Sequence, residues 1–114
     1  MSGTNGTAKP ARRPTSKRRS ALRFEVLNAF VDGGMSDLSR AELAVWLILF
    51  RDAKPPRGEA PASLDDLARR GGMDRQTASR AIGKLKSRKM LRVLRRGGLN
   101  RGPSTYLVFP SAME

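Results

Sequence analysis

One predicted helix in the C-terminal half of the chain carries side chains whose chemistry suits nucleic-acid bases. Arginine can donate two hydrogen bonds to guanine O6 and N7, and glutamine can pair with adenine in the same bidentate way. Gln76 and Arg80 are four residues apart, so on a helix they share one face. The pattern predicts a surface that contacts base edges in the major groove of duplex DNA. The candidate residues are Arg75, Gln76, Thr77, Ser79, Arg80, Lys84 and Lys86.

Cations towards the end of the same helix suit a different contact. Lys84, Lys86, Arg88 and Lys89 follow the base-reading candidates and are better matched to phosphates, which position a protein without reading sequence. The alternative is that these charges are only the solvated face of an amphipathic helix. An isolated helix of this kind would favour that alternative, but the charge pattern of the whole chain does not.

The placement of charge along the chain supports contact with a polyanion. The formal net charge is +13, with six Lys or Arg and no acid in residues 1–19, a net −2 in residues 20–74, and ten basic residues and no acid in residues 75–101. A charge that served only solubility would mix signs throughout. Two acid-free basic blocks beside a balanced body predict surfaces that bind nucleic acid.

The residues that most enzymes need are missing. The chain has no Cys and no His, which excludes disulfides, thiol nucleophiles, the common zinc sites and the usual general base. The acids are explained as helix-cap and first-turn residues, as with Asp65, Asp66 and Asp74. The sequence therefore predicts a protein that is not an enzyme and binds neither a metal nor another cofactor.

The N-terminal residues 1–19 are rich in Gly, Thr, Ser, Pro, Lys and Arg. Such a composition cannot bury enough apolar surface to offset the entropy of ordering, so we expect a disordered basic tail. Order is expected to begin at Ser20, the N-cap of a helix over 21–31, within one domain that spans residues 20–114. The tail cations expected to contact DNA are Arg12, Arg13, Lys17, Arg18 and Arg19.

Ser39 is the clearest helix start. With Glu42 three residues later it fits a capping box, in which the Ser39 hydroxyl accepts from the Glu42 amide and the Glu42 carboxylate reaches back to the Ser39 amide. The following residues 43–50 are apolar on nearly every side, which predicts a helix deep in the fold. This run of eight is far shorter than the roughly 20 residues that span a bilayer. Core positions are expected for Phe24, Phe30, Trp46, Leu47 and Phe50, and a subunit interface is the alternative for Phe24, Phe30 and Trp46.

Turn and cap signals place the remaining elements. Ser63 and Asp74 are N-caps, and Gly71-Gly72 separates the helices that they begin. Gly83 lies inside the second of these helices at a cost of about 1 kcal/mol relative to Ala, which indicates either a close contact or a locally weak helix. The expected elements are a loop over 54–62, helices over 63–70 and 75–89, strands over 90–94 and 105–109, and a turn-rich loop over 95–103.

The helix pair resembles a known motif. Residues 63–68 and 72–85 follow a pattern of a polar cap, Leu-Ala, a glycine turn, and then a hydroxyl residue, a small apolar residue, Arg and Leu. This is similar to bacterial and phage winged-helix proteins such as MarR- and GntR-type repressors, and the resemblance covers residues 24–109. It implies a mainly α fold with a small β-hairpin wing, an α+β winged helix-turn-helix, whose recognition helix is 75–89. It also implies wing contacts to the minor groove or the DNA backbone from Arg95, Arg96, Asn100 and Arg101.

Sequence-specific binding of double-stranded DNA in transcriptional regulation is therefore the expected function. Residues 37–54 also resemble the N-terminal winged-helix module of phage and plasmid replication-initiation proteins, so a replication or plasmid-maintenance accessory role stays open. A non-specific architectural or RNA-binding protein is a further alternative. A homodimer, or a protein partner that contacts helices 20–52, is open as well. Neither a membrane span nor a secretion signal is expected, which predicts a cytoplasmic, nucleoid-associated protein.

Overall fold

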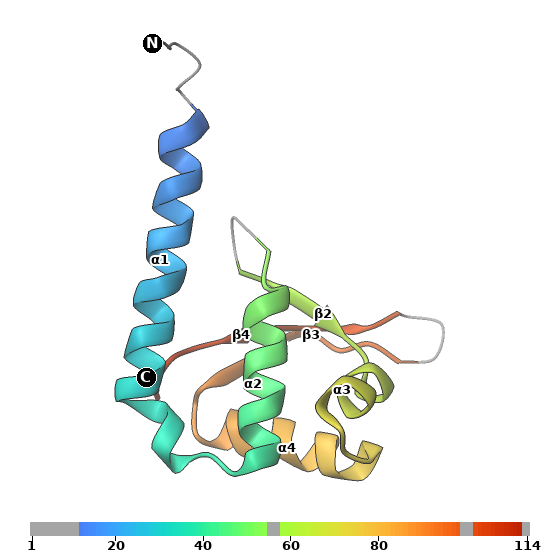
Figure 1. Ribbon diagram of the computed structural model, residues 1–114. Helices are drawn as coiled ribbons and strands as arrows, with labels where there is room; N and C mark the ends of the chain where they lie inside the picture. The colour runs from blue at the N-terminus through green and yellow to red at the C-terminus, as the bar shows by residue number, and fades with distance from the viewer. Residues whose placement is uncertain (1–11, 55–57, 99–101, 113–114) are drawn as a thin grey trace, which may run out of the picture.

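A computed structural model describes residues 12–54, 58–98 and 102–112, with the backbone alone for residues 12–19. Within these ranges the protein is mainly helical with a small three-stranded antiparallel sheet, which confirms the α+β prediction at this level (Figure 1). The elements are α1 (Arg12–Asp32), a short 3-10 helix η1 (Gly34–Asp37), α2 (Arg40–Asp52), β2 (Ala60–Ala62), α3 (Leu64–Gly71), α4 (Arg75–Ser87), β3 (Leu91–Arg95) and β4 (Ser104–Val108).

The sheet contains a strand that the sequence analysis assigned to a loop. Its order is β2-β4-β3, so β4 is central, with Tyr106 opposite both Ala60 and Val93. Proline is tolerated in β2 because β2 is an edge strand. Pro61 has no backbone N–H, but no strand lies on the outer side of β2 to accept a hydrogen bond from it. Ala60 and Ala62 are buried on either side of the exposed Pro61, so a short alternating pattern was present but was masked by the prolines around it.

The core is organised around α2. Trp46 is fully buried, and its ring stacks on Phe30 of α1 with centroids 3.7 Å apart. The indole Nε1 donates to the Phe109 carbonyl at 2.9 Å, so the polar atom of this large side chain is satisfied. The core positions expected for Phe30 and Trp46 are confirmed, and this contact joins α1, α2 and the residue that follows β4.

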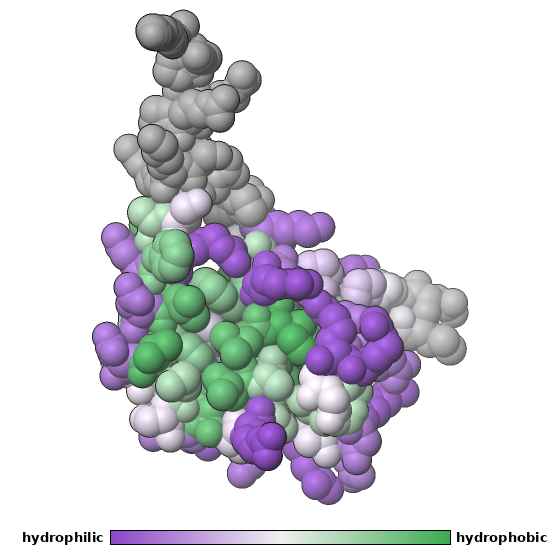
Figure 2. Space-filling model, viewed as in Figure 1, coloured by the Kyte–Doolittle hydropathy of each residue, from purple (hydrophilic) through white to green (hydrophobic). Residues whose placement is uncertain are grey.

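Two expected core residues are exposed instead. Phe24 is 66% exposed and Leu47 is 41% exposed, so the prediction that both lie in the core is wrong. On α1, Phe24 lies six residues before the buried Phe30 and therefore points about 120° away from it. Figure 2 shows apolar side chains gathered over the face that α1 and α2 present to the viewer. Helix α1 packs on the rest of the protein along one side only, so Phe24 on its other side stays exposed.

Helix α1 begins well before Ser20. It runs from Arg12, so Ser20 lies within the helix and is not its N-cap, and the backbone of residues 12–19 is helical where the sequence analysis expected a disordered tail. Pro14 fits the first turn, whose backbone N–H groups have no partner within a helix. Residues 1–11 lie outside the described part of the chain. Figure 1 shows the N-terminal turns of α1 standing clear of the rest of the protein.

The start of α2 confirms half of the predicted capping box. Ser39 Oγ accepts from the Glu42 amide at 3.2 Å, as expected. The Glu42 carboxylate bonds elsewhere, since it accepts from the Ser39 hydroxyl at 3.0 Å and from Arg88 Nε at 2.8 Å rather than from the Ser39 amide. Glu42 is only 4% exposed, so this carboxylate joins α2 to the end of α4 inside the fold.

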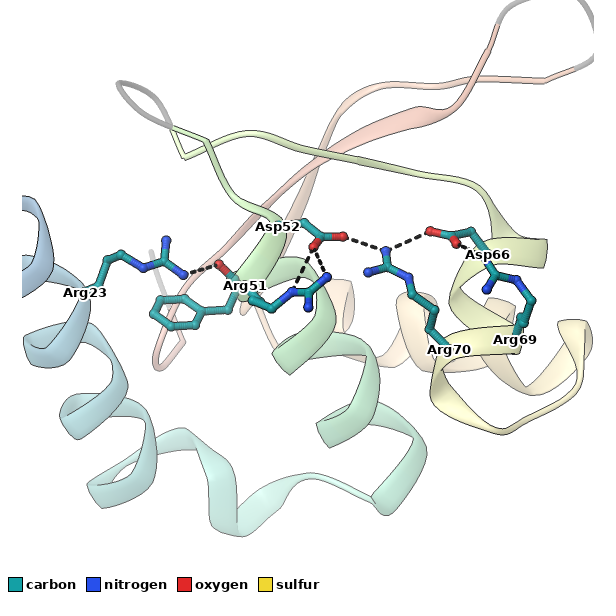
Figure 3. A network of polar contacts seen from close by, with 7 residues as sticks. Arg23, Arg51, Asp52, Asp66, Arg69 and Arg70 are labelled. Carbon is teal, nitrogen blue, oxygen red and sulfur yellow. Dashed lines mark hydrogen bonds and ion pairs between the residues drawn. The ribbon is translucent and has the colours of Figure 1, made fainter.

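A second polar network joins the end of α2 to α3 (Figure 3). Arg70 Nη2 donates to Asp52 Oδ2 at 2.5 Å and to Asp66 Oδ2 at 2.7 Å. Arg51 and Arg69 extend the network from the outside, on Asp52 and Asp66 respectively. The hydrogen bond from Arg70 is the main cause that lowers the pKa of Asp52 below its ordinary value of 3.8.

Asp52→Asn tests this network through the pH dependence of stability. A carboxylate with a lowered pKa stabilises the fold above pH 3.8 and loses that contribution as pH falls through the lower pKa of the folded state. The variant should be less stable than the wild type at pH 7 and should lose less stability on acidification, as measured by urea unfolding between pH 7 and pH 2. Asp37→Asn, at an exposed carboxylate in η1, is the control. Parallel curves for wild type and Asp52→Asn would contradict the prediction.

Candidate nucleic-acid interface

The two helices α3 and α4 are capped and joined as the sequence predicts. Ser63 Oγ accepts from the Asp66 amide at 3.1 Å, and Asp74 Oδ1 accepts from the Thr77 amide at 2.7 Å. This second bond holds the pKa of Asp74 below its ordinary value. Between the helices, Gly72 has φ 67 and ψ 39, a left-handed conformation that favours glycine. The turn between α3 and α4 is thus fixed by local interactions.

Helix α4 has a buried face and a cationic face. Ala78, Ala81 and Leu85 are buried against the core, and their small or compact side chains let α4 lie close to α2 and α3. Thr77 is half-buried beside the Asp74 cap, so its side chain is less accessible to DNA than the sequence analysis expected. The helix ends at Ser87, two residues before the predicted end. The other predicted residues of this helix are all exposed, namely Arg75, Gln76, Ser79, Arg80, Lys84 and Lys86.

Two arginines near this face are engaged with carboxylates. Arg75 Nε is 3.7 Å from Asp65 Oδ1, and both side chains are largely exposed, so the pair is weak and Arg75 can exchange it for another anion. Arg88 is different, because its Nε lies 2.8 Å from the buried carboxylate of Glu42. Its side chain is still 36% exposed, so the phosphate contact expected of Arg88 stays a prediction beside this role in holding α4 to α2.

The β3–β4 hairpin carries the second predicted group of residues. Arg95 and Arg96 are exposed at the end of β3, while Asn100 and Arg101 lie outside the described residues. The Gly97 amide donates to Ser104 Oγ at 2.8 Å, and the backbone of Gly102 lies so close to Gly97 that a Cβ there would clash. The end of the hairpin is therefore tightly closed where it is described, and Figure 1 shows it extending past α3.

The cations predicted for the N-terminal tail belong to helix α1. Only the backbone is described for the five of them, Arg12, Arg13, Lys17, Arg18 and Arg19.

Arg92 on β3 is an exposed cation that the sequence analysis did not include. It alternates along the strand with the inward-facing Leu91 and Val93. That alternation was the signal that could have found it.

Within the described ranges, no group of three or more Asp or Glu side chains could hold a metal ion. No described helix is long and apolar enough to cross a membrane. No model of a known protein family matches the chain, and no curated protein matches its sequence.

Gly83 is the unexplained residue of the cationic face. It is exposed, and a Cβ built on it would meet nothing within 4 Å. The sequence analysis offered a close contact as one reason for glycine at this position, but no such contact exists within the described chain. Gly83 lies three residues after Arg80 and seven after Gln76, so all three share one side of α4.

Gly83→Ala should stabilise the isolated protein. Replacing an exposed mid-helix glycine by alanine removes an entropic cost of about 1 kcal/mol, and here the added methyl group meets open space. Chemical denaturation should show the free energy of unfolding rising by about that amount. Gly34→Ala is the matched control and should destabilise, because its Cβ would lie 2.6 Å from the Pro110 carbonyl oxygen. A destabilised Gly83→Ala variant would show that α4 needs glycine for its own packing.

Proposed function

We propose that this protein binds double-stranded DNA in a sequence-specific manner, with a winged helix-turn-helix fold, and that it regulates transcription. In this proposal α3 and α4 are the helix-turn-helix, and α4 is the recognition helix in the major groove. The β3–β4 hairpin is the wing and lies on the backbone or in the minor groove.

The observation that carries the proposal is the composition of the exposed face of α4. Gln76 and Arg80 lie in the first two turns, where a recognition helix meets base edges, and both are exposed. A protein that only coats DNA would be served by lysines alone. This face instead combines an amide and a guanidinium, the two groups that read adenine and guanine by paired hydrogen bonds.

The surroundings of α4 support the same assignment. Residues 75–101 contain ten basic residues and no acid, and they include α4, β3 and the start of the hairpin turn. The acids nearest in sequence, Asp65, Asp66 and Asp74, lie at the starts of α3 and α4. Positive charge is thus concentrated where the duplex would lie, which favours phosphate contacts on both sides of the major groove.

The expected protein partner or second copy stays a prediction. The exposed large apolar side chains on which such a contact would form are Leu22, Phe24 and Val31 of α1 and Leu47 of α2. They lie on helices other than the proposed recognition helix, so a partner there would leave α4 free for DNA.

A salt titration tests nucleic-acid binding as such. Lys and Arg that contact phosphates release condensed counterions, so affinity for duplex DNA should fall steeply as salt rises. With about six phosphate contacts, log affinity plotted against log salt should have a slope of about −5. Fluorescence anisotropy with a labelled duplex measures it. A nearly flat titration would exclude the proposal.

Gln76→Ala and Arg80→Ala test sequence reading. Neither side chain is in the core, so both variants should fold, and α4 should lose nothing in helix propensity. On a site selected from random DNA, each should lose about 1–3 kcal/mol of discrimination at one or two base positions. On a scrambled duplex at the same salt concentration the loss should be much smaller.

The control is Arg51→Ala, which removes a cation that is 76% exposed at the end of α2 remote from α4. It should affect neither duplex strongly. Equal losses by Gln76→Ala and Arg80→Ala on both duplexes would indicate a non-specific architectural protein instead of a sequence-specific regulator.

A further inference from the structure

An open groove with a volume of about 460 Å³ lies between the end of α4 and strand β3. Five cations line it, and none of its lining residues is acidic. Strand β3 is an edge strand, so no strand pairs with its outer edge. The lining cations are Lys86, Lys89, Arg92, Arg95 and Arg96.

Lys89 has a backbone conformation that does not suit lysine. Its φ is 62, and it is the only non-glycine residue with a positive φ in the described ranges. It follows α4 in a helix-ending turn, in which the Met90 amide donates to the Leu85 carbonyl at 3.0 Å. Glycine is the usual residue at such a position, and this chain has glycine, Gly72, in the left-handed conformation at the end of α3. A lysine that makes the turn less stable indicates a use for its side chain.

Arg92 is held at the groove by its surroundings. Its guanidinium lies over the ring of Phe109, 5.7 Å from the centroid, and Phe109 also lines the groove. Within the described chain, no carboxylate pairs with Lys86, Lys89 or Arg92. These three charges are therefore available to an anion from outside.

We propose that this groove binds the phosphodiester backbone of the duplex whose major groove α4 occupies, with Lys86, Lys89 and Arg92 on phosphates. Lys86 belongs both to the exposed side of α4 and to the groove, so the two surfaces are continuous. The cations are spread along the groove, which suits an extended polyanion better than a single small anion. The inference rests on the proposed DNA-binding function. It adds Arg92 to the contacts and assigns Lys89, already expected on phosphates, to this groove.

Lys89→Gly distinguishes an effect on DNA binding from an effect on folding, because it should raise the stability of the protein and lower its affinity for DNA. Removing the left-handed lysine should raise the Tm by about 4 °C. Affinity for duplex DNA at 0.1 M salt should fall roughly five- to tenfold, and the magnitude of the salt slope should fall by about 0.9, the loss of one phosphate contact. The loss should be equal on selected and scrambled duplexes, since phosphates carry no sequence information.

Three further variants complete the experiment. Arg92→Gln should weaken binding in the same way as Lys89→Gly, and Lys89→Arg, which keeps the charge, should bind like the wild type. Lys54→Gln removes an exposed cation that does not line this groove and should change nothing. If the wild type binds the duplex and Lys89→Gly and Arg92→Gln bind it equally well with the same salt slope, the groove proposal is overturned and the proposed function stands. If the wild type binds no duplex, both are overturned.

Discussion

The arrangement of the whole protein depends on the packing of Trp46. Its ring stacks between Phe30 and Phe50, with centroid distances of 3.7 and 5.1 Å, and its indole N–H is bound by the Phe109 carbonyl. Burying an indole without a partner for that N–H would cost about 1–3 kcal/mol, so the chain after β4 must return to α2. One side chain therefore fixes α1 and the end of the sheet on the same helix, and α2 becomes the frame to which the other elements attach.

Two ion pairs at opposite ends of α2 then determine how α3 and α4 lie. Asp52 binds Arg70 of α3 at one end, and Glu42 binds Arg88, just past α4, at the other. Glu42 is almost fully buried, so the loss of Arg88 would leave an unpaired charge inside the fold, which is far more costly than the loss of a surface pair. Because these pairs attach α3 and α4 to the two ends of α2, the orientation of α4 is fixed. Ala78 and Leu85 face the core, and the opposite face of α4 is exposed to solvent. Positioning this face uses an arginine that would otherwise add to the cationic surface.

Local signals were predictable from the sequence, and long-range ones were not. The caps at Ser39, Ser63 and Asp74 and the glycine turn after α3 depend on residues within a few positions of one another, and all are as expected. The strand β2 and the exposed position of Phe24 depend instead on what packs beside them, which hydrophobicity alone does not reveal. The Glu42–Arg88 pair spans 46 residues and has no local signature at all. For the candidate interface, the sequence identified the exposed residues of α4, but it revealed neither the half-buried position of Thr77 nor the exposed Arg92 on β3.

Helix α4 and its end contain two residue choices that oppose local stability. Gly83 lies where almost any other residue would make a better helix, and Lys89 lies where glycine would make a better turn. Neither choice is explained by packing within the described chain, since a Cβ on Gly83 meets nothing and the Lys89 side chain is exposed. The caps at Ser39, Ser63 and Asp74 and the glycine turn after α3 agree with local preference. Natural sequences depart from local preference mainly at functional sites. In the proposed complex with DNA, Gly83 would give the duplex close access to the backbone of α4, and Lys89 would present a charge at the end of that helix.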